Sequence, residues 1–194
     1  MDIWDIMDAA INGGISHWCE YAEYMGEWLN ELSHFVTIKY QSVNGNHDEL
    51  RLLDGKRGNF PEDNMCKIIS SYIKLRLKDN DNFIMIENPT GYGYMQLCGS
   101  TVLCMHGSEI KGSRKSVMDQ LSSLYHPIDY LVSAHLHHAK NETVGLNKEI
   151  IQVPSIIGID DYSISLNKSA NPGATLVVFE KSYGKTVQYD IKLD

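Results

Sequence analysis

Apolar and polar positions recur along this chain with two periods, one typical of helices and one typical of strands. Residues 15–32 and 61–77 repeat apolar side chains every three or four positions, which predicts two amphipathic helices. Ser16 suits the N-cap of the first, and Pro61 suits the first turn of the second. A shorter helix is predicted over residues 113–124. Short runs rich in Val, Ile, Tyr and Thr predict strands at residues 35–43, 82–87, 92–98, 101–105 and 129–133, and hairpins at 142–153 and 174–192.

These elements mix helices with strands and show no internal repeat or linker, which predicts the α/β class. The 194 residues are enough for one domain with a substantial core, so we expect a single domain over residues 1–194. The polar, Asn-rich residues 159–173 are predicted to form a surface loop.

Composition and charge indicate where the protein is expected to be found more than what it does. The net charge of −8 gives no general attraction to nucleic acid or anionic membrane, although bound divalent cations would reverse the local field at a phosphate. No stretch approaches the ~20 apolar residues of a membrane span. The four cysteines have irregular spacing and form no CxxC pair, which indicates reduced core residues. We therefore expect a cytoplasmic protein without a membrane partner.

Residue types that bind metals follow three of the predicted strands. Asn46 and His47 follow the first, His106 follows residues 101–105, and His135 and His137 follow residues 129–133. In layered α/β sheets, ligand sites lie at the carboxyl ends of strands. We therefore expect the three segments to converge on one edge.

The spacing within these segments suggests a chemistry. In extended backbone, His135 and His137 would point to one face, where two imidazoles could serve two adjacent metals. Two-metal sites activate water and clamp the oxygens of an in-line displacement at phosphorus. Mixed imidazole, amide and carboxylate ligands suit Mn, Fe, Zn or Ni better than Ca or Mg. The Asp48 carboxylate beside His47 could keep that imidazole protonated, as an acid for a leaving alkoxide.

Simpler interpretations of the same residues remain open. Any one of these histidines, taken alone, is more often structural or exposed than a metal ligand, and His126 and His138 have that interpretation. Cys104 and His106 could belong to a structural zinc site, but no second Cys-His pair completes four ligands.

The run Gly45-Asn46-His47-Asp48, then His106-Gly107, then Ala134-His135-Leu136-His137 resembles the last three motifs of the calcineurin-like metallophosphoesterases, in their usual order. Ala134 replaces the usual Gly. The resemblance implies a metallo-dependent phosphatase-like α/β/β/α sandwich that binds two divalent ions, with Mn favoured. It assigns Asn46, His106 and His135 to one ion and His137 to the other. It also implies that His47, with Asp48, acts on the leaving group as general acid.

The two earlier motifs of that family match poorly. Its first motif, Asp-x-His, is absent, while Met1-Asp2-Ile3-Trp4-Asp5 is similar to its second, with Asp2 as the carboxylate that bridges both ions. The resemblance then implies a chain truncated at its N-terminus that lacks the first strands of the fold and holds one ion or none. A sheet without those strands would expose backbone and apolar surface, which favours a homo-oligomer.

Two functional hypotheses follow from the resemblance. Leu50-Arg51 and His106-Gly107-Ser108-Glu109 are most similar to the phage and bacterial branch of DNA-repair exonucleases, which implies a nucleic acid or other phosphodiester substrate, with Arg51 as a candidate contact. Further candidates for phosphate contact are Lys56, Arg57, Arg114 and Lys115, although exposed basic residues in loops usually contact only water. Under this hypothesis, a metal-bound hydroxide attacks phosphorus. The alternative is a non-catalytic fragment or pseudoenzyme that binds at most one metal and self-associates.

Overall fold

The computed structural model describes residues 15–46, 48–49, 64–88, 90–108, 110–124, 126–159, 164–165 and 169–193. The chain divides into two compact units, Met1–Pro89 and Thr90–Asp194, and each is described by itself. The single domain over residues 1–194 stays a prediction. Among the described helices, none has both the length and the apolar character needed to cross a membrane.

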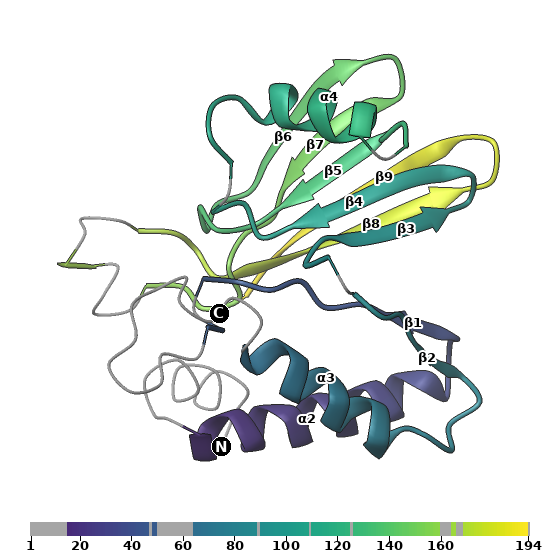
Figure 1. Ribbon diagram of the computed structural model, residues 1–194, viewed down its shortest axis with the longest axis vertical. Coiled ribbons are helices and arrows are strands. Elements are labelled where there is room, and N and C mark those ends of the chain that lie inside the picture. The colour runs from purple at the N-terminus through teal and green to yellow at the C-terminus, as the bar shows by residue number, and fades with distance from the viewer. Residues whose placement is uncertain are drawn as a thin grey trace. The chain divides into compact units, whose positions relative to one another are not determined.

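The described residues of the first unit form two helices and a small parallel sheet (Figure 1). Helix α2 (Ile15–Ser33) and helix α3 (Met65–Arg76) share a core with strands β1 (Ile38–Tyr40) and β2 (Phe83–Met85), which pair in parallel. Both helices are amphipathic, as their spacing predicts, and each packs apolar residues on this core, although Ile68 and Leu75 of α3 are more than half exposed. The core is formed by Ala22, Leu29, Met65, Ile69, Ile73 and Leu77.

Two boundaries in this unit differ from the sequence prediction. Helix α3 begins at Met65 because Asn64 is its N-cap, with a side chain that accepts a hydrogen bond from the Lys67 amide at 3.1 Å. Strand β1 has three residues instead of the nine predicted, since its described pairing is with three residues of β2. Apolar and β-branched residues precede β1 at Phe35, Val36 and Thr37, but strand length depends on the partner as well as on propensity.

The second unit is built on a five-stranded mixed sheet with the order β3-β4-β5-β7-β6. The three central strands pair in parallel, and each edge strand pairs antiparallel with its neighbour. The sequence predicts all five strands to within about two residues at each end. Their bounds are β3 (Gly93–Leu97), β4 (Ser100–Met105), β5 (Tyr130–Ser133), β6 (Lys140–Gly145) and β7 (Lys148–Gln152).

Both faces of this sheet are covered within the second unit (Figure 1). Helix α4 (Arg114–Leu124) packs Met118 and Leu121 on one face, against Leu103 and Leu131. On the other face, the hairpin of β8 (Gly173–Glu180) and β9 (Gly184–Lys192) contributes Val177 and Phe179 to a second cluster around Tyr130 and Ile151. This gives a helix, sheet and sheet layering, and the α/β class with a central mixed sheet is confirmed. The four-layer sandwich without its first strands stays a prediction.

The cysteines differ from expectation in their burial. All four are free thiols, but Cys19 and Cys98 are exposed, whereas Cys66 and Cys104 are partly buried. Cys98 and Gly99 form the turn between β3 and β4, where both have positive φ angles of 53° and 91°. The prediction of core positions is therefore wrong for Cys19 and Cys98. An apolar run in a two-stranded hairpin can end in a turn that faces solvent.

Candidate metal centre

The carboxyl ends of β4 and β5 meet at one edge of the sheet. The two strands are parallel neighbours, with Met105 opposite Ser133 at the last pair of the ladder. The amide of Ala134 donates a hydrogen bond to the carbonyl of His106 at 3.0 Å, which continues the pairing one residue beyond the strands. Two of the three histidine-bearing segments therefore converge, as the strand order predicts.

His106 and His135, called here the imidazole pair, are brought into direct contact by this arrangement. His106 Nε2 lies 3.1 Å from His135 Nδ1. The ring centroids are 4.9 Å apart and the rings are inclined at 64°, so they meet edge to face. Both side chains are partly buried. Residues 29 positions apart in sequence thus place two ring nitrogens at one point.

The separation of these two nitrogens suits a shared metal ion. Two imidazole nitrogens each about 2.0–2.1 Å from one ion lie about 2.9–3.4 Å apart when the ligand angle is between octahedral and tetrahedral. The observed 3.1 Å falls within that range. It also suits a hydrogen bond between the rings, for which one nitrogen must carry a proton. Within the described residues, no group of three or more His, Cys, Asp or Glu is arranged to hold a metal.

The segment after β5 is not extended, which corrects the reasoning from residue spacing. Strand β5 ends at Ser133, and His135 and His137 have left-handed φ angles of 71° and 60°. Strand alternation therefore does not place the two side chains on one face. Histidine is among the non-glycine residues that adopt this region more often, but the conformation still costs of order 1–3 kcal/mol. Strain of this kind clusters at functional sites.

Gly107 allows the two strand ends to come this close. Its φ angle is 103°, and a Cβ placed on it would lie 3.2 Å from the carbonyl oxygen of Ala134. The same Cβ would lie 3.6 Å from the Cβ atoms of both Ser133 and His135. Any side chain here would meet a strained backbone and a rigid neighbour. Glycine after His106 therefore supports the approach of the imidazole pair.

Asn46 and Asp48 belong to the first unit, in the loop that follows β1. The Asp48 carboxylate accepts a hydrogen bond from the Gly45 amide at 2.7 Å. The backbone carbonyl of Asp48 accepts another from the Met65 amide at 2.7 Å. Burial raises the pKa of Tyr21, and the Asp48 carboxylate adds to that increase. Asp48 is thus held in place by backbone groups on both sides. The described residues do not test its predicted action on His47.

Three predicted site residues, Asp2, His47 and Arg51, lie outside the described residues. The structure brings together His106 and His135, places the exposed His137 two residues beyond His135, and describes Asn46 and Asp48 within the other unit. One residue that supports the imidazole pair was not singled out from the sequence. This is the buried Ser133, a polar residue at the last position of an otherwise apolar strand.

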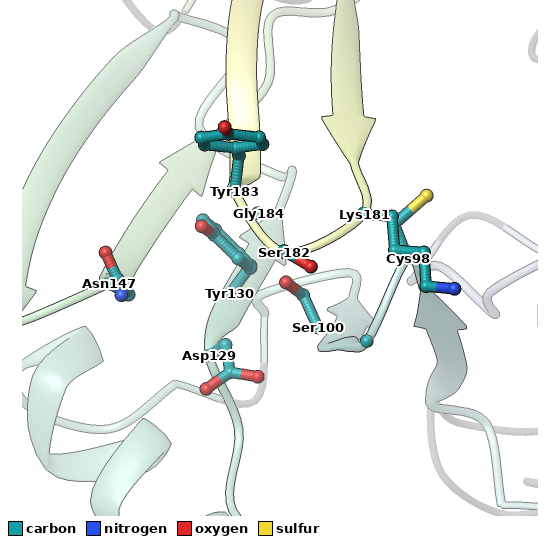
Figure 2. A pocket seen from close by; sticks show the side chains of 10 residues that line it. Cys98, Ser100, Asp129, Tyr130, Asn147, Lys181, Ser182, Tyr183 and Gly184 are labelled. Atoms are coloured by element: carbon teal, nitrogen blue, oxygen red, sulfur yellow. The ribbon is translucent and has the colours of Figure 1, made fainter.

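A depression at the opposite end of the same sheet is distinct from this centre. It is bordered by the first residues of β4 and β5 and by the turns between β3 and β4, β6 and β7, and β8 and β9 (Figure 2). Tyr130 lines it, and the Tyr130 hydroxyl accepts a hydrogen bond from the Lys185 amide at 3.1 Å. None of the predicted site residues lines it.

Comparison with known proteins gives one curated relative and several partial structural likenesses. No protein-family profile matches the sequence. The SPbeta prophage-derived uncharacterized protein YonJ of Bacillus subtilis is 35% identical over 187 residues, which cover 94% of this chain and 46% of YonJ. The chain thus spans about half the length of this curated relative. The similarity extends over nearly the whole sequence described above.

The structural likenesses are weaker. Vps29 of Entamoeba histolytica, in a crystal structure with Zn²⁺, is 16% identical with a TM-score of 0.41, over 61% of this chain and 74% of Vps29. A novel archaeal phosphodiesterase is 15% identical with a TM-score of 0.43, over 69% of this chain and 65% of that protein. Vps29 of Chaetomium thermophilum is 9% identical with a TM-score of 0.40, over 62% and 74%.

Proposed function

We propose that this protein is a metal-dependent phosphoesterase that hydrolyses phosphodiester bonds, with nucleic acid as its substrate. The observation that carries the proposal is the imidazole pair, two ring nitrogens 3.1 Å apart at the carboxyl ends of adjacent parallel strands. The resemblance to calcineurin-like metallophosphoesterases assigns both histidines, His106 and His135, as metal ligands. The prophage origin of YonJ is consistent with the phage branch of that resemblance, from which the nucleic-acid substrate is taken.

The remaining ligands in this proposal come from the same resemblance. By that resemblance, His106, His135 and Asn46 would be ligands of one divalent ion, His137 would be a ligand of the other, and Asp2 would be a ligand of both. Mn is the favoured metal, with Fe, Zn or Ni as alternatives that suit the same donor atoms. Bound ions of this kind supply Lewis-acid activation of water and of the phosphoryl oxygens.

The chain's own residues then divide the remaining work. The imidazole pair and Asn46 would act only through the ion that they hold. His47 gives a proton to the departing oxygen, and Asp48 keeps His47 oriented and protonated. The hydrogen bond from Gly45 fixes the Asp48 carboxylate on one side, which leaves its other oxygen for His47 in this proposal.

Hydrolysis of bis(p-nitrophenyl) phosphate and of single-stranded DNA by the Mn-loaded chain tests the proposal. We expect His106→Ala to lose both metal and activity, and His47→Ala to lose activity by at least about 100-fold with its metal retained. His126→Ala, which changes an exposed histidine elsewhere in the second unit, is the control and should match the wild type. Absence of product with Mn, Zn, Fe or Ni would favour the non-catalytic alternative.

The proposal includes self-association through an exposed sheet. Leu176, Tyr189 and Ile191 of the β8 and β9 hairpin are each more than two-fifths exposed, at 52%, 53% and 43%. Leu176 and Tyr189 are direct partners in the hairpin ladder, so they lie on one face. Light scattering across a range of protein concentrations should show a dimer or larger species, and a monomer throughout would contradict this part.

A further inference from the structure

Arg114 is tied to the strand that leads into the imidazole pair. It is the first residue of α4, and its Nε donates a hydrogen bond to the Ser133 hydroxyl at 3.0 Å. Ser133 is the last residue of β5 and is 1% exposed. The guanidinium of Arg114, a flexible side chain elsewhere, is therefore held at the carboxyl edge of the sheet.

This attachment lies one contact away from the imidazole pair. A Cβ placed on Gly107 would lie 3.6 Å from the Cβ atoms of both Ser133 and His135, so these two side chains border the same small space. His135 follows Ser133 by two residues, and Gly107 follows His106 directly. Ser133, whose hydroxyl accepts the hydrogen bond from Arg114, is thus part of the packing that positions both histidines.

The charge of Arg114 is not neutralised by this contact. A serine hydroxyl accepts the Nε hydrogen but carries no charge. Among the described residues, no carboxylate lies within ion-pair distance of this guanidinium, although the protein has 25 acidic residues and a net charge of −8. The two terminal nitrogens form a planar fork that matches the oxygens of a phosphate.

The N-cap of α4 is provided by a residue other than Arg114. Ser113 accepts a hydrogen bond from the Ser116 amide at 3.2 Å, so the first turn of α4 has its own N-cap. A positive charge in the first turn of a helix opposes the helix dipole. Arg114 is therefore unfavourable for α4 by itself, and its position calls for another partner.

We infer that Arg114 is a phosphate-binding residue of the proposed site, with its terminal nitrogens on a non-bridging oxygen of the scissile phosphodiester. This inference rests on the proposed function. Ser133 acts as a positioning residue, because it holds Nε and leaves the terminal nitrogens for substrate. Lys115 is the next residue of the same turn and is exposed, without a described partner that would hold it at the edge of the sheet, so the inference does not extend to it.

Steady-state kinetics on bis(p-nitrophenyl) phosphate with Mn tests the assignment. Loss of a charge-assisted bond predicts that Arg114→Ala lowers kcat/KM by about 10- to 100-fold. Arg114→Lys keeps the charge and should recover part of this loss. Inhibition by inorganic phosphate should weaken in parallel with kcat/KM. Ser133→Ala should raise KM with a smaller effect on kcat, and the control His126→Ala should stay within about twofold of the wild type.

Metal content and melting temperature separate this role from a structural one. Arg114→Ala should keep the metal content of the wild type and melt close to it. If the variant loses its metal or its fold together with activity, or if kcat/KM stays within twofold of the wild type, the inference is overturned. His106→Ala in the same assay separates the two proposals. An active His106→Ala chain refutes the function itself, whereas an inactive one beside an unaffected Arg114→Ala chain refutes the role of Arg114 alone.

Discussion

Replacement of His106 distinguishes a shared metal ion from a hydrogen bond within the imidazole pair. The 3.1 Å between Nε2 and Nδ1 suits both. If the pair binds metal, Mn at about 100 times its dissociation constant stabilises the folded chain by about 2.7 kcal/mol. For a chain of this size, that free energy raises the melting temperature by about 5–11 °C.

The two explanations predict different results for His106→Ala. With a metal ligand removed, we expect the rise in melting temperature on adding Mn to disappear. With only a hydrogen bond removed, the variant loses about 1 kcal/mol, equivalent to about 2–4 °C, with and without Mn alike. His135→Asn is the matching variant, because asparagine tolerates the left-handed φ of 71° at that position.

Melting temperature should be measured by circular dichroism at several Mn concentrations, with metal content by elemental analysis. His126→Ala is the control and should keep the full response to Mn. A wild-type chain whose melting temperature does not respond to Mn, Zn, Fe or Ni would refute the metal centre. Equal responses of the wild type and His106→Ala would refute the part played by the imidazole pair.

Two further predictions concern backbone conformation and pH. His137→Gly should raise the free energy of unfolding by about 1 kcal/mol, because glycine adopts the φ of 60° without strain, while His137→Ala should give no gain; urea denaturation measures both. Burial, with a contribution from Asp48, raises the pKa of the Cys66 thiol above its ordinary value of 9.0. As pH rises past that value, only the unfolded chain releases this proton, so stability falls. Cys66→Ala should show a flatter decrease above about pH 9, and equal slopes would contradict the prediction.

The sequence predicts most elements of the second unit because local signals agree with the fold there. Asn147 and Ser182 both have positive φ in hairpin turns, at 52° and 71°, and the apolar runs beside them form the expected strands. In the first unit, the nine-residue strand predicted after α2 is reduced to Ile38–Tyr40. The length of β1 follows from its pairing with β2, and sequence periodicity gives no information about that pairing.

The candidate site could be predicted in its residue types but not in its geometry. Metal-binding residues after successive strands indicate an edge, and the parallel register of β4 and β5 brings His106 and His135 there. The left-handed φ angles of His135 and His137 could not be predicted, because they follow from how the chain leaves β5 next to Gly107. The bond between Arg114 and Ser133 joins residues 19 positions apart, and it likewise depends on packing.

The register that places Met105 opposite Ser133 has a consequence for how the protein matures. His106 and His135 are separated by 29 positions, so an unfolded chain would have to close a long loop before both could reach one ion. When β4 and β5 pair in parallel during folding, this loop is closed before any ion binds. In the proposed protein, newly made chains would therefore acquire metal only after this pair of strands has formed. Metal uptake during refolding would then report when the centre of the sheet is assembled.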